Sequence, residues 1–333
     1  MMASAASASA SASASASASA SAPPAAPVPA LGVITVTFNA ATFLRSFLAC
    51  CLAQTQCDFA LLVIDNCSAD NTLAVLSEVQ DARVQVLANK QNIGYAAACN
   101  QALDYFRERG VSDVLFINND TEFAPDLFAS LLALRVRFNA DAVTPRVCYA
   151  EDTRINWYAG GRFTFWKGFQ GEHLGDGQLH DPADVVPRWT PVAPGCCVLF
   201  PLATFERIGL FDPNYFVYFE DTDYFLRMAR GGLRLLYAPG TVIAHKISLS
   251  TGGALSDFSI RYYQRNQMYI LRKHFGPATV ALQVVLLFLK ASVRLLLRRD
   301  SLHQYALRLS SLVEGWKMPL PQAALSPAVR GDS

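Results

Sequence analysis

From residue 31 onward, short apolar runs alternate regularly with amphipathic segments, and this alternation limits the possible folds more than any other feature. Buried strands of a parallel sheet read as continuous apolar runs, whereas helices repeat their apolar residues every three to four positions. Strands that alternate with helices build parallel β-α-β units, so we predict a wound α/β fold. The predicted strands are 31–38, 60–64, 84–88 and 114–117, and the predicted helices are 43–53, 71–79 and 95–109.

The order weakens in the second half of the chain. A helix at 125–138 and a short strand at 142–144 are predicted before a stretch, 149–188, that is rich in Gly, aromatic and charged residues. Such a stretch is typical of a hairpin or mobile loop that carries specificity. Apolar order then returns, with a buried run at 195–200, a helix at 202–208, a helix closed by Gly231 and Gly232, and a strand ending at His245.

The first 30 residues are an alternating Ser-Ala tract followed by a Pro-rich stretch. A secretory signal needs a cationic start and a long apolar stretch, and this tract has neither. Small side chains bury too little apolar area to offset the entropy of ordering the backbone. We therefore expect a disordered leader at 1–30 and a flexible tail at 321–333.

Charge and cysteine content exclude several classes of protein. Lys and Arg total 28 against 27 Asp and Glu, a net charge of +1, so there is no broad basic field for nucleic acid. The eight cysteines form no paired C-x-x-C arrangement of the kind that binds zinc. We interpret them as reduced thiols of a cytoplasmic protein.

Three polar clusters directly follow predicted strands or apolar runs, at 65–70, 118–120 and 220–223. Residues just past the carboxyl ends of strands in a wound sheet converge on one crevice, so the three clusters are expected to form one polar site that can bind a metal ion. No Gly-x-Gly-x-x-Gly follows the first strand, which argues against a dinucleotide-binding dehydrogenase. The Gly-rich phosphate loop of nucleotidyltransferases is also absent there.

Five motifs in this order resemble the family 2 glycosyltransferases, closest to their rhamnosyltransferase-like branch. The resemblance runs from about residue 31 to 275 and implies a GT-A-like, Rossmann-like mixed sheet, with a nucleotide half at about 31–122 and an acceptor half at about 123–275. The motifs are Val36-Thr37-Phe38-Asn39, Asp65 to Thr72, Asn92 to Asn100, Asn118-Asn119-Asp120, and Phe211-Asp212 with Tyr218 to Asp223, followed by Arg227, His245 and Ser250.

The resemblance also implies roles for individual residues. Asp221 would be the general base that deprotonates the acceptor hydroxyl, and Glu220 would position the acceptor or Asp221. Asp120, with His245, would hold a divalent metal ion (Mg²⁺ or Mn²⁺) that stabilises the leaving nucleotide, although Asn118 stands where the family usually has Asp. The residues expected to bind the donor nucleotide are Thr37, Asn39, Asp65, Ser68, Asn92, Gly94, Asn100 and Asn119.

Each of these residues also has a simpler structural explanation. Asp65 fits an Asx turn, Asp70 or Ser68 fits a helix N-cap, and Gly94 fits a turn into the following helix. The acids at 220–223 would in any case favour the amino end of a helix through its dipole. Trp157, Trp166 and Trp189 are candidates for stacking on sugars or for anchoring loops.

The sequence therefore predicts an inverting glycosyltransferase that moves a sugar from a nucleotide-diphosphate donor to a glycan or lipid-linked acceptor. Bacterial surface polysaccharide is the expected product class. The alternative is a catalytically silent nucleotide- or glycan-binding protein of the same fold. The donor sugar, its base, the acceptor and the linkage do not follow from the sequence.

The C-terminal segment 276–320 has a different composition. Residues 278–289 are almost wholly apolar, but Lys290 and Arg294 interrupt the run before it reaches the length of a bilayer span. Flanking cations, with Arg298 and Arg299 among them, suit anionic headgroups, so we expect a helical, membrane-associating appendage on the inner face of the cell membrane. A buried helical hairpin or a dimer interface is the competing interpretation.

Overall fold

The computed structural model describes residues 28–246 and 256–321. Apart from residues 28–30 and 321, the predicted disordered leader and the predicted tail lie outside these ranges. The motif residue Ser250 also lies outside them.

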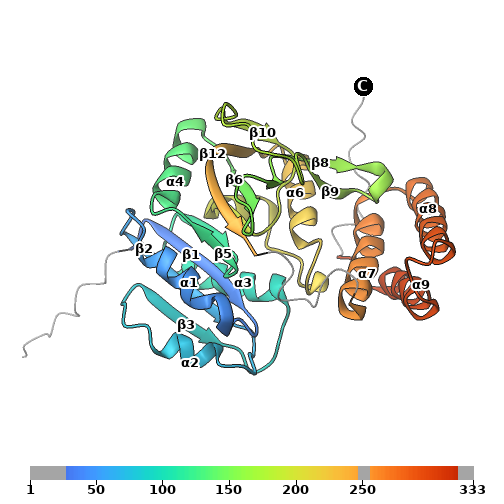
Figure 1. Ribbon diagram of the computed structural model, residues 1–333, viewed down its shortest axis with the longest axis horizontal. Coiled ribbons are helices and arrows are strands. Elements are labelled where there is room, and N and C mark those ends of the chain that lie inside the picture. The colour runs from blue at the N-terminus through green and yellow to red at the C-terminus, as the bar shows by residue number, and fades with distance from the viewer. Residues whose placement is uncertain (1–27, 247–255, 322–333) are drawn as a thin grey trace, which may run out of the picture.

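A mixed ten-stranded sheet organises the chain (Figure 1). Strands β1, β2, β3 and β4 are mutually parallel along the order β4-β1-β2-β3, as the alternation of strands and helices predicts. Beyond β4 the sheet turns mixed, because β11 pairs antiparallel with both β4 and β6. Along the order β10-β12-β6-β11-β4-β1-β2-β3 the strands are Arg188–Thr190, Leu235–His245, Ala142–Tyr149, Cys197–Pro201, Asp113–Ile117, Leu31–Thr37, Phe59–Asp65 and Val84–Ala88, with β5 (Thr121–Phe123) on β12 and β7 (Asn156–Tyr158) on β6.

Helices connect the parallel strands and bury one apolar stripe each. In α1 the stripe runs from Phe43 to Cys51, close to the predicted face. Gly32 of β1 leaves room for α3, since a Cβ there would lie 2.8 Å from the Phe106 ring. The buried side chains of these helices and of the strands form one large hydrophobic core around the sheet. The helices of this part are α1 (Ala41–Leu52), α2 (Thr72–Ser77), α3 (Tyr95–Glu108), α4 (Leu127–Phe138), α5 (Leu202–Ile208) and α6 (Glu220–Arg230).

The predicted strand at 142–144 is longer in the structure. β6 extends to Tyr149 because β12 pairs with it in parallel over almost its whole length, a partner about ninety residues away in sequence. The stretch 149–188 contains the predicted hairpin, formed by β8 (Gly161–Thr164) and β9 (Gln170–His173). Its tip is held by two side-chain amides, because Gln267 donates to the Lys167 carbonyl at 2.8 Å and Gln283 to the Phe165 carbonyl at 2.8 Å.

Three C-terminal helices form a bundle at one end of the molecule (Figure 1). They are α7 (Asp257–His274), α8 (Pro277–Leu296) and α9 (Leu302–Lys317), and their shared core contains Met268, Leu271, Val280, Leu287 and Leu312. Two predicted regions pack together in this bundle. Helix α7 belongs to the acceptor half that the resemblance implies, whereas α8 and α9 belong to the predicted appendage 276–320.

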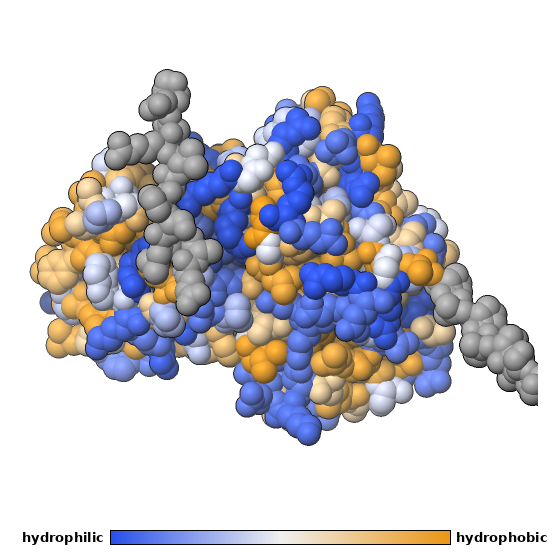
Figure 2. Space-filling view, turned by 180° about the vertical axis from the view of Figure 1, so that it is seen from behind, coloured by the Kyte–Doolittle hydropathy of each residue, from blue (hydrophilic) through white to orange (hydrophobic). Residues whose placement is uncertain are grey.

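Helix α8 is apolar on two faces. One stripe, with Val280, Leu287 and Ala291, is buried in the bundle, whereas Leu282, Val285 and other residues on the opposite side are exposed. Within the described residues α8 is the one helix long and apolar enough to cross a membrane, a criterion of length and composition alone, and 22% of its apolar window is buried. This helix is longer than the predicted apolar run 278–289. Hydrophobic residues gather at the end of the surface where α8 and α9 lie (Figure 2, left).

Candidate active site

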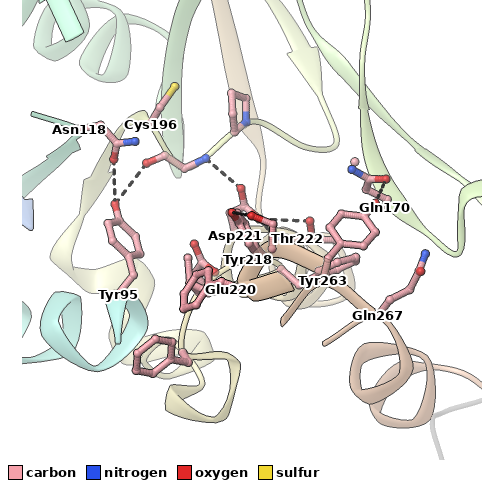
Figure 3. Close-up of a pocket in the computed structure, with 18 of the residues that line it drawn as sticks. Tyr95, Asn118, Gln170, Cys196, Tyr218, Glu220, Asp221, Thr222, Tyr263 and Gln267 are labelled. Atoms are coloured by element: carbon pink, nitrogen blue, oxygen red, sulfur yellow. Dashed lines mark hydrogen bonds between the residues drawn. The ribbon is translucent and has the colours of Figure 1, made fainter. Parts of the chain in front are cut away.

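A cavity of about 1070 Å³ opens between the carboxyl ends of the sheet strands and the C-terminal bundle. One wall, which we call the strand side, consists of Thr37, Asn118, Asn119, Asp120 and His245. The opposite wall, the helical side, consists of Tyr263, Gln267, Lys290, Arg294 and Arg308. Glu220 and Asp221 of α6 point into the space between them, as Figure 3 shows.

Strand pairing brings Asp120 and His245 together. Asp120 precedes β5, and β5 pairs with the end of β12 so that His245 stands opposite Thr121. His245 Nε2 lies 3.2 Å from Asp120 Oδ1, and both side chains are buried. Neither Asp120 Oδ1 nor His245 Nδ1 has a hydrogen-bond partner in the described part of the chain. The two predicted metal ligands therefore form a buried pair with spare acceptor capacity.

No third side chain completes this pair. The described residues contain no group of three or more His, Cys, Asp or Glu side chains placed to hold a metal ion. At the position where the family usually has Asp, the Asn118 amide oxygen lies 3.4 Å from the Tyr95 hydroxyl. Asn119 donates to the Val36 carbonyl at 2.8 Å and so fastens this turn to the end of β1.

Of the residues predicted to bind the donor, four line the cavity: Thr37, Asn92, Gly94 and Asn119. The Thr37 hydroxyl is buried without a hydrogen-bond partner among the described residues, which leaves it free for a ligand. Asn92 Oδ1 accepts from Asn66 Nδ2 at 2.8 Å and from the Gly94 amide at 3.0 Å. Gly94 has a positive φ of 86°, and a Cβ there would lie 2.7 Å from the Phe216 carbonyl oxygen. This glycine thus permits the close approach of the 216 loop.

Asp65, Ser68 and Asn39 form a hydrogen-bonded loop network that does not line the cavity. The Ser68 amide donates to Asp65 Oδ2 at 3.1 Å, and the Asn39 amide donates to Ser68 Oγ at 2.8 Å. Asp65 is buried and its Oδ1 has no hydrogen-bond partner within the described residues. The predicted N-cap role of Asp70 or Ser68 is wrong, because Asn71 is the N-cap of α2 and its side chain makes no capping hydrogen bond. Asp70 instead accepts from the Thr72 and Ala41 amides and fastens the loop before the helix.

Asn100 also lies away from the cavity. Its Nδ2 donates to the Phe211 carbonyl at 2.9 Å, and its Oδ1 accepts from the Phe211 amide at 3.1 Å. Both ends of the amide are therefore used to join α3 to the segment before α6. Sequence spacing alone does not distinguish this structural contact from ligand binding.

Glu220 and Asp221 begin α6 directly after Phe219, whose φ of 71° turns the chain sharply into the cavity. Asp221 Oδ2 accepts from the Gly195 amide at 3.0 Å, and its Oδ1 accepts from the amide and hydroxyl of Thr222. Burial raises the pKa of Asp221, while these hydrogen bonds favour its ionised form. Burial and the charge of Asp221 together raise the pKa of Glu220 to about 8. Burial and the neighbouring charge therefore favour Glu220 as the protonated member of the pair, and the hydrogen bonds favour Asp221 as the carboxylate.

Asp223 points away from the cavity although it is only two residues further along α6. Its carboxylate is fully buried and contacts Lys273 Nζ at 2.8 Å, His274 Nε2 at 2.7 Å and Arg227 Nε at 2.9 Å. These partners hold the pKa of Asp223 well below its usual range. Lys273 also contacts Asp212 at 2.7 Å. This buried cluster attaches α7, and with it the C-terminal bundle, to the helix that carries Glu220 and Asp221.

Sequence reasoning missed two aromatic residues of the cavity wall, His173 and Tyr95. The Trp157 ring lies between two imidazoles, with centroids 4.4 Å from His173 and 4.9 Å from His245. Burial lowers the pKa of His173, which favours the neutral ring. The sequence feature that could have indicated His173 as a site residue is the Gly- and aromatic-rich stretch in which it lies. Of the three candidate Trp residues, Trp157 lines the cavity, whereas Trp166 and Trp189 are exposed outside it.

Comparison with known proteins adds to this geometry. The model of the family described as Glycosyl transferase family 2 matches residues 32–208. The chain is 26% identical over 305 residues to the N-acetylglucosaminyl-diphospho-decaprenol L-rhamnosyltransferase of Mycobacterium tuberculosis, covering 86% of this chain and 98% of the relative. It is 27% identical over 236 residues to the O-antigen biosynthesis protein RfbC of Myxococcus xanthus, covering 68% of this chain but only 18% of that protein.

Two solved structures show the same fold. The mannosyltransferase PcManGT from Pyrobaculum calidifontis, in complex with GDP-Man and Mn²⁺, superposes with a TM-score of 0.54 at 19% identity, covering 89% of this chain and 78% of that chain. GalNAc-T7 with UDP, GalNAc and Mn²⁺ gives a TM-score of 0.55 at 15% identity, covering 74% of this chain and about half (51%) of that chain. The predicted GT-A-like fold is confirmed.

Proposed function

Because this chain belongs to glycosyl transferase family 2 and is a glycosyltransferase, we propose that it transfers a sugar from a nucleotide-diphosphate donor to a lipid-linked or glycan acceptor with inversion. The observation that carries the proposal is the shared cavity, which places the carboxylate of Asp221 between the strand side and the helical side. The intact acid pair favours catalysis over the catalytically silent alternative.

Asp221 is the proposed general base. An acceptor hydroxyl is a weak nucleophile unless its proton is removed as the new bond forms. In direct displacement the hydroxyl oxygen attacks the anomeric carbon, the bond to the diphosphate breaks, and Asp221 takes the proton. The hydrogen bonds from Gly195 and Thr222 fix the carboxylate, and protonated Glu220 beside it removes a competing negative charge.

Asp120 and His245 are the proposed metal ligands, and their geometry fits a hard divalent cation. Neighbouring ligands of an octahedral Mg²⁺ or Mn²⁺ ion lie about 3 Å apart, close to the 3.2 Å between His245 Nε2 and Asp120 Oδ1. Such ions commonly bind one or two protein ligands together with phosphates of the substrate, so a site without a third side chain is sufficient. A bound ion would stabilise negative charge on the departing diphosphate.

The strand side is the proposed donor site. Thr37, Asn92 and Asn119 line the cavity beside the Asp120 and His245 pair, and the GT-A structures named above were solved with UDP or GDP-Man. Asp65, Ser68 and Asn39 would act through the loop that they form, with the free Oδ1 of Asp65 as a candidate acceptor for the base.

The acceptor is proposed to be a lipid-linked saccharide at the inner face of the cell membrane, in surface polysaccharide synthesis. The mycobacterial relative is named for a diphospho-decaprenol acceptor. The exposed face of α8, with Leu282, Val285, Phe288, Leu289 and Val293, would enter the interface, and Arg298 and Arg299 beside it would meet anionic headgroups.

A screen of sugar nucleotides tests the proposed function. Purified protein with Mg²⁺ or Mn²⁺ is incubated with each donor and a short-chain prenyl-diphospho-N-acetylglucosamine, and products are analysed by mass spectrometry and NMR. We expect one donor to be transferred with inversion of its anomeric configuration. A retained configuration would overturn Asp221 as the base, and the absence of transfer or donor hydrolysis across the panel would overturn the function.

Vesicle co-sedimentation tests the membrane proposal. Replacing Val285 and Leu289 by Glu puts two charges on the exposed face of α8, so binding to anionic vesicles should fall by about tenfold or more. Val136→Glu on α4, also an exposed apolar residue, is the matched control and should bind normally. Equal binding of all variants would contradict insertion of this face.

A further inference from the structure

A group of three cations lines the cavity at its far end from the donor site. Lys290 and Arg294 come from α8 and Arg308 from α9, and all three belong to the helical side. The nucleotide chemistry proposed for the strand side does not use them. Helices α8 and α9, which carry these cations, lie at the end of the molecule opposite β1, beyond α6 and α7 (Figure 1).

Asp300 holds two of these cations in fixed positions. Its buried carboxylate accepts from Nε and Nη2 of Arg294 at 2.9 and 2.8 Å, and from Nε and Nη2 of Arg308 at 2.7 and 3.3 Å. The Nη1 atom of each guanidinium forms no hydrogen bond within the described residues and keeps two N–H donors. One carboxylate therefore orients both guanidinium groups and leaves part of each available for a ligand.

The charges in this group do not balance. Lys290, Arg294 and Arg308 carry three positive charges against the single negative charge of Asp300. Lys290 forms no ion pair or hydrogen bond with any residue that the structure describes, and the nearby Lys167 is already paired with Glu172 at 2.8 Å. An excess of two positive charges at the wall of a cavity suits an anion of comparable charge, such as a diphosphate.

An apolar path begins next to these cations. Leu289 and Val293 are each adjacent in sequence to one of the cations of α8, and both side chains are about half exposed on the surface of the bundle. A ligand with an anionic group at Lys290 and Arg294 could therefore lay a hydrocarbon chain along α8. A sugar on the other side of the anionic group would enter the cavity toward Asp221.

We propose that Lys290, Arg294 and Arg308 bind the diphosphate of a prenyl-diphosphate-linked acceptor, whose hydrocarbon chain leaves the protein along α8. The inference rests on the proposed function and assigns its acceptor site. Two diphosphates would then occupy the cavity during transfer. The donor diphosphate lies on the strand side, the acceptor diphosphate on the helical side, and Asp221 between them.

Calorimetry with geranyl diphosphate tests this site without turnover. The titration is performed with the full-length protein in Mg²⁺ and saturating UDP, so that the donor site is filled. Lys290→Gln is compared with Lys317→Gln, which removes the same charge at the exposed end of α9 and does not line the cavity. We expect Lys290→Gln to weaken binding about tenfold and Lys290→Glu more, since a charge-assisted contact is lost, and Lys317→Gln to bind normally.

Several results would overturn the site. They are equal affinities of Lys290→Gln and Lys317→Gln, a weaker affinity for geranyl diphosphate in saturating UDP than without UDP, or geraniol binding as tightly as geranyl diphosphate. A loss confined to anionic vesicle binding, with geranyl diphosphate binding unchanged, would assign the cations to lipid headgroups instead. Thermal denaturation confirms that each variant is folded.

The same variants separate this inference from the proposed function. With geranyl-diphospho-N-acetylglucosamine as acceptor, the site predicts a raised KM for the acceptor in Lys290→Gln, with an unchanged KM for the donor. Transfer with an unchanged acceptor KM would retain the function and reject the site. Lys290-dependent binding of geranyl diphosphate without any sugar transfer would retain the site and reject the function.

Discussion

The two walls of the cavity are built in different ways. On the strand side, polar residues follow the ends of strands. Asn119 donates to the Val36 carbonyl, whereas Thr37 Oγ1, Asp120 Oδ1 and His245 Nδ1 have no hydrogen-bond partner among the described residues. On the helical side, cations come from two helices of a bundle and exceed the available acids. The strand side thus offers a hydroxyl and acceptor atoms to a ligand, whereas the helical side offers cations.

This difference indicates that the two walls bind different substrates. Free hydroxyl and acceptor atoms suit a nucleotide and its metal ion, and the charged helical wall suits an anionic acceptor. α6 connects the two, because Asp221 faces the cavity while Asp223 anchors the bundle. Variants of α6 and of the strand side therefore test whether the two walls have separate roles.

The largest effect on turnover is expected for Asp221, which lies between the two walls. Asp221→Asn keeps the shape of the side chain but cannot accept a proton, so kcat should fall by about a hundredfold to ten-thousandfold while donor binding persists. Initial rates and donor titration measure both quantities. Near-normal turnover by this variant would remove Asp221 from the proposed role and with it the catalytic link between the walls.

Asp223→Asn should instead damage the fold. The change leaves Lys273, Arg227 and His274 buried with one acid fewer, which lowers the free energy of unfolding by about 3 kcal/mol or more. The depressed pKa of Asp223 means that this stabilisation is complete above an unfolded pKa of about 3.9 and is lost as pH falls below it. Urea denaturation at neutral pH measures the loss. Unchanged stability would show that the bundle is attached by other contacts.

Asp120→Ala tests the strand side. Loss of a metal ligand should abolish the dependence on Mg²⁺ or Mn²⁺ and lower activity by about a hundredfold. Asn118→Asp, which adds a carboxylate beside it, is expected to strengthen metal binding. Activity is measured against metal concentration for both variants. Equal wild-type activity in excess chelator and in Mn²⁺ would reject a metal-dependent donor site.

The smallest effect concerns Glu220. Its folded pKa of about 8 lies above that of an exposed Glu, so folding takes up a proton and wild-type stability declines as pH rises from about 4.5 to 8. Glu220→Gln does not titrate and should be more stable than wild type by a margin that grows with pH, at most about 1.4 kcal/mol per pH unit. Melting temperatures at pH 6 and 8.5 measure it. An equal margin at both values would contradict the raised pKa.

Several elements could be predicted from sequence because their causes are local. The apolar period defines α1 and α3, and the runs at 60–64 and 84–88 fall within β2 and β3. The position of Asp120 at a strand end and of Glu220 and Asp221 at a helix start also follow from local patterns. The length of β6 could not be predicted, because its partner β12 lies far along the chain.

The wound α/β fold, the family resemblance and the acids that face the cavity could be predicted from sequence, because strand and helix periods and short motifs lie in neighbouring residues. Which polar groups form hydrogen bonds within the protein depends instead on its packing in three dimensions. Asn100 hydrogen-bonds to the Phe211 backbone, Gly94 allows the close approach of Phe216, and Asp223 forms an ion pair with Lys273 of α7. The same packing also places Lys290, Arg294 and Arg308 at the same cavity as Asp221. These contacts depend on packing between segments that are distant in the chain, so a local sequence pattern does not predict them.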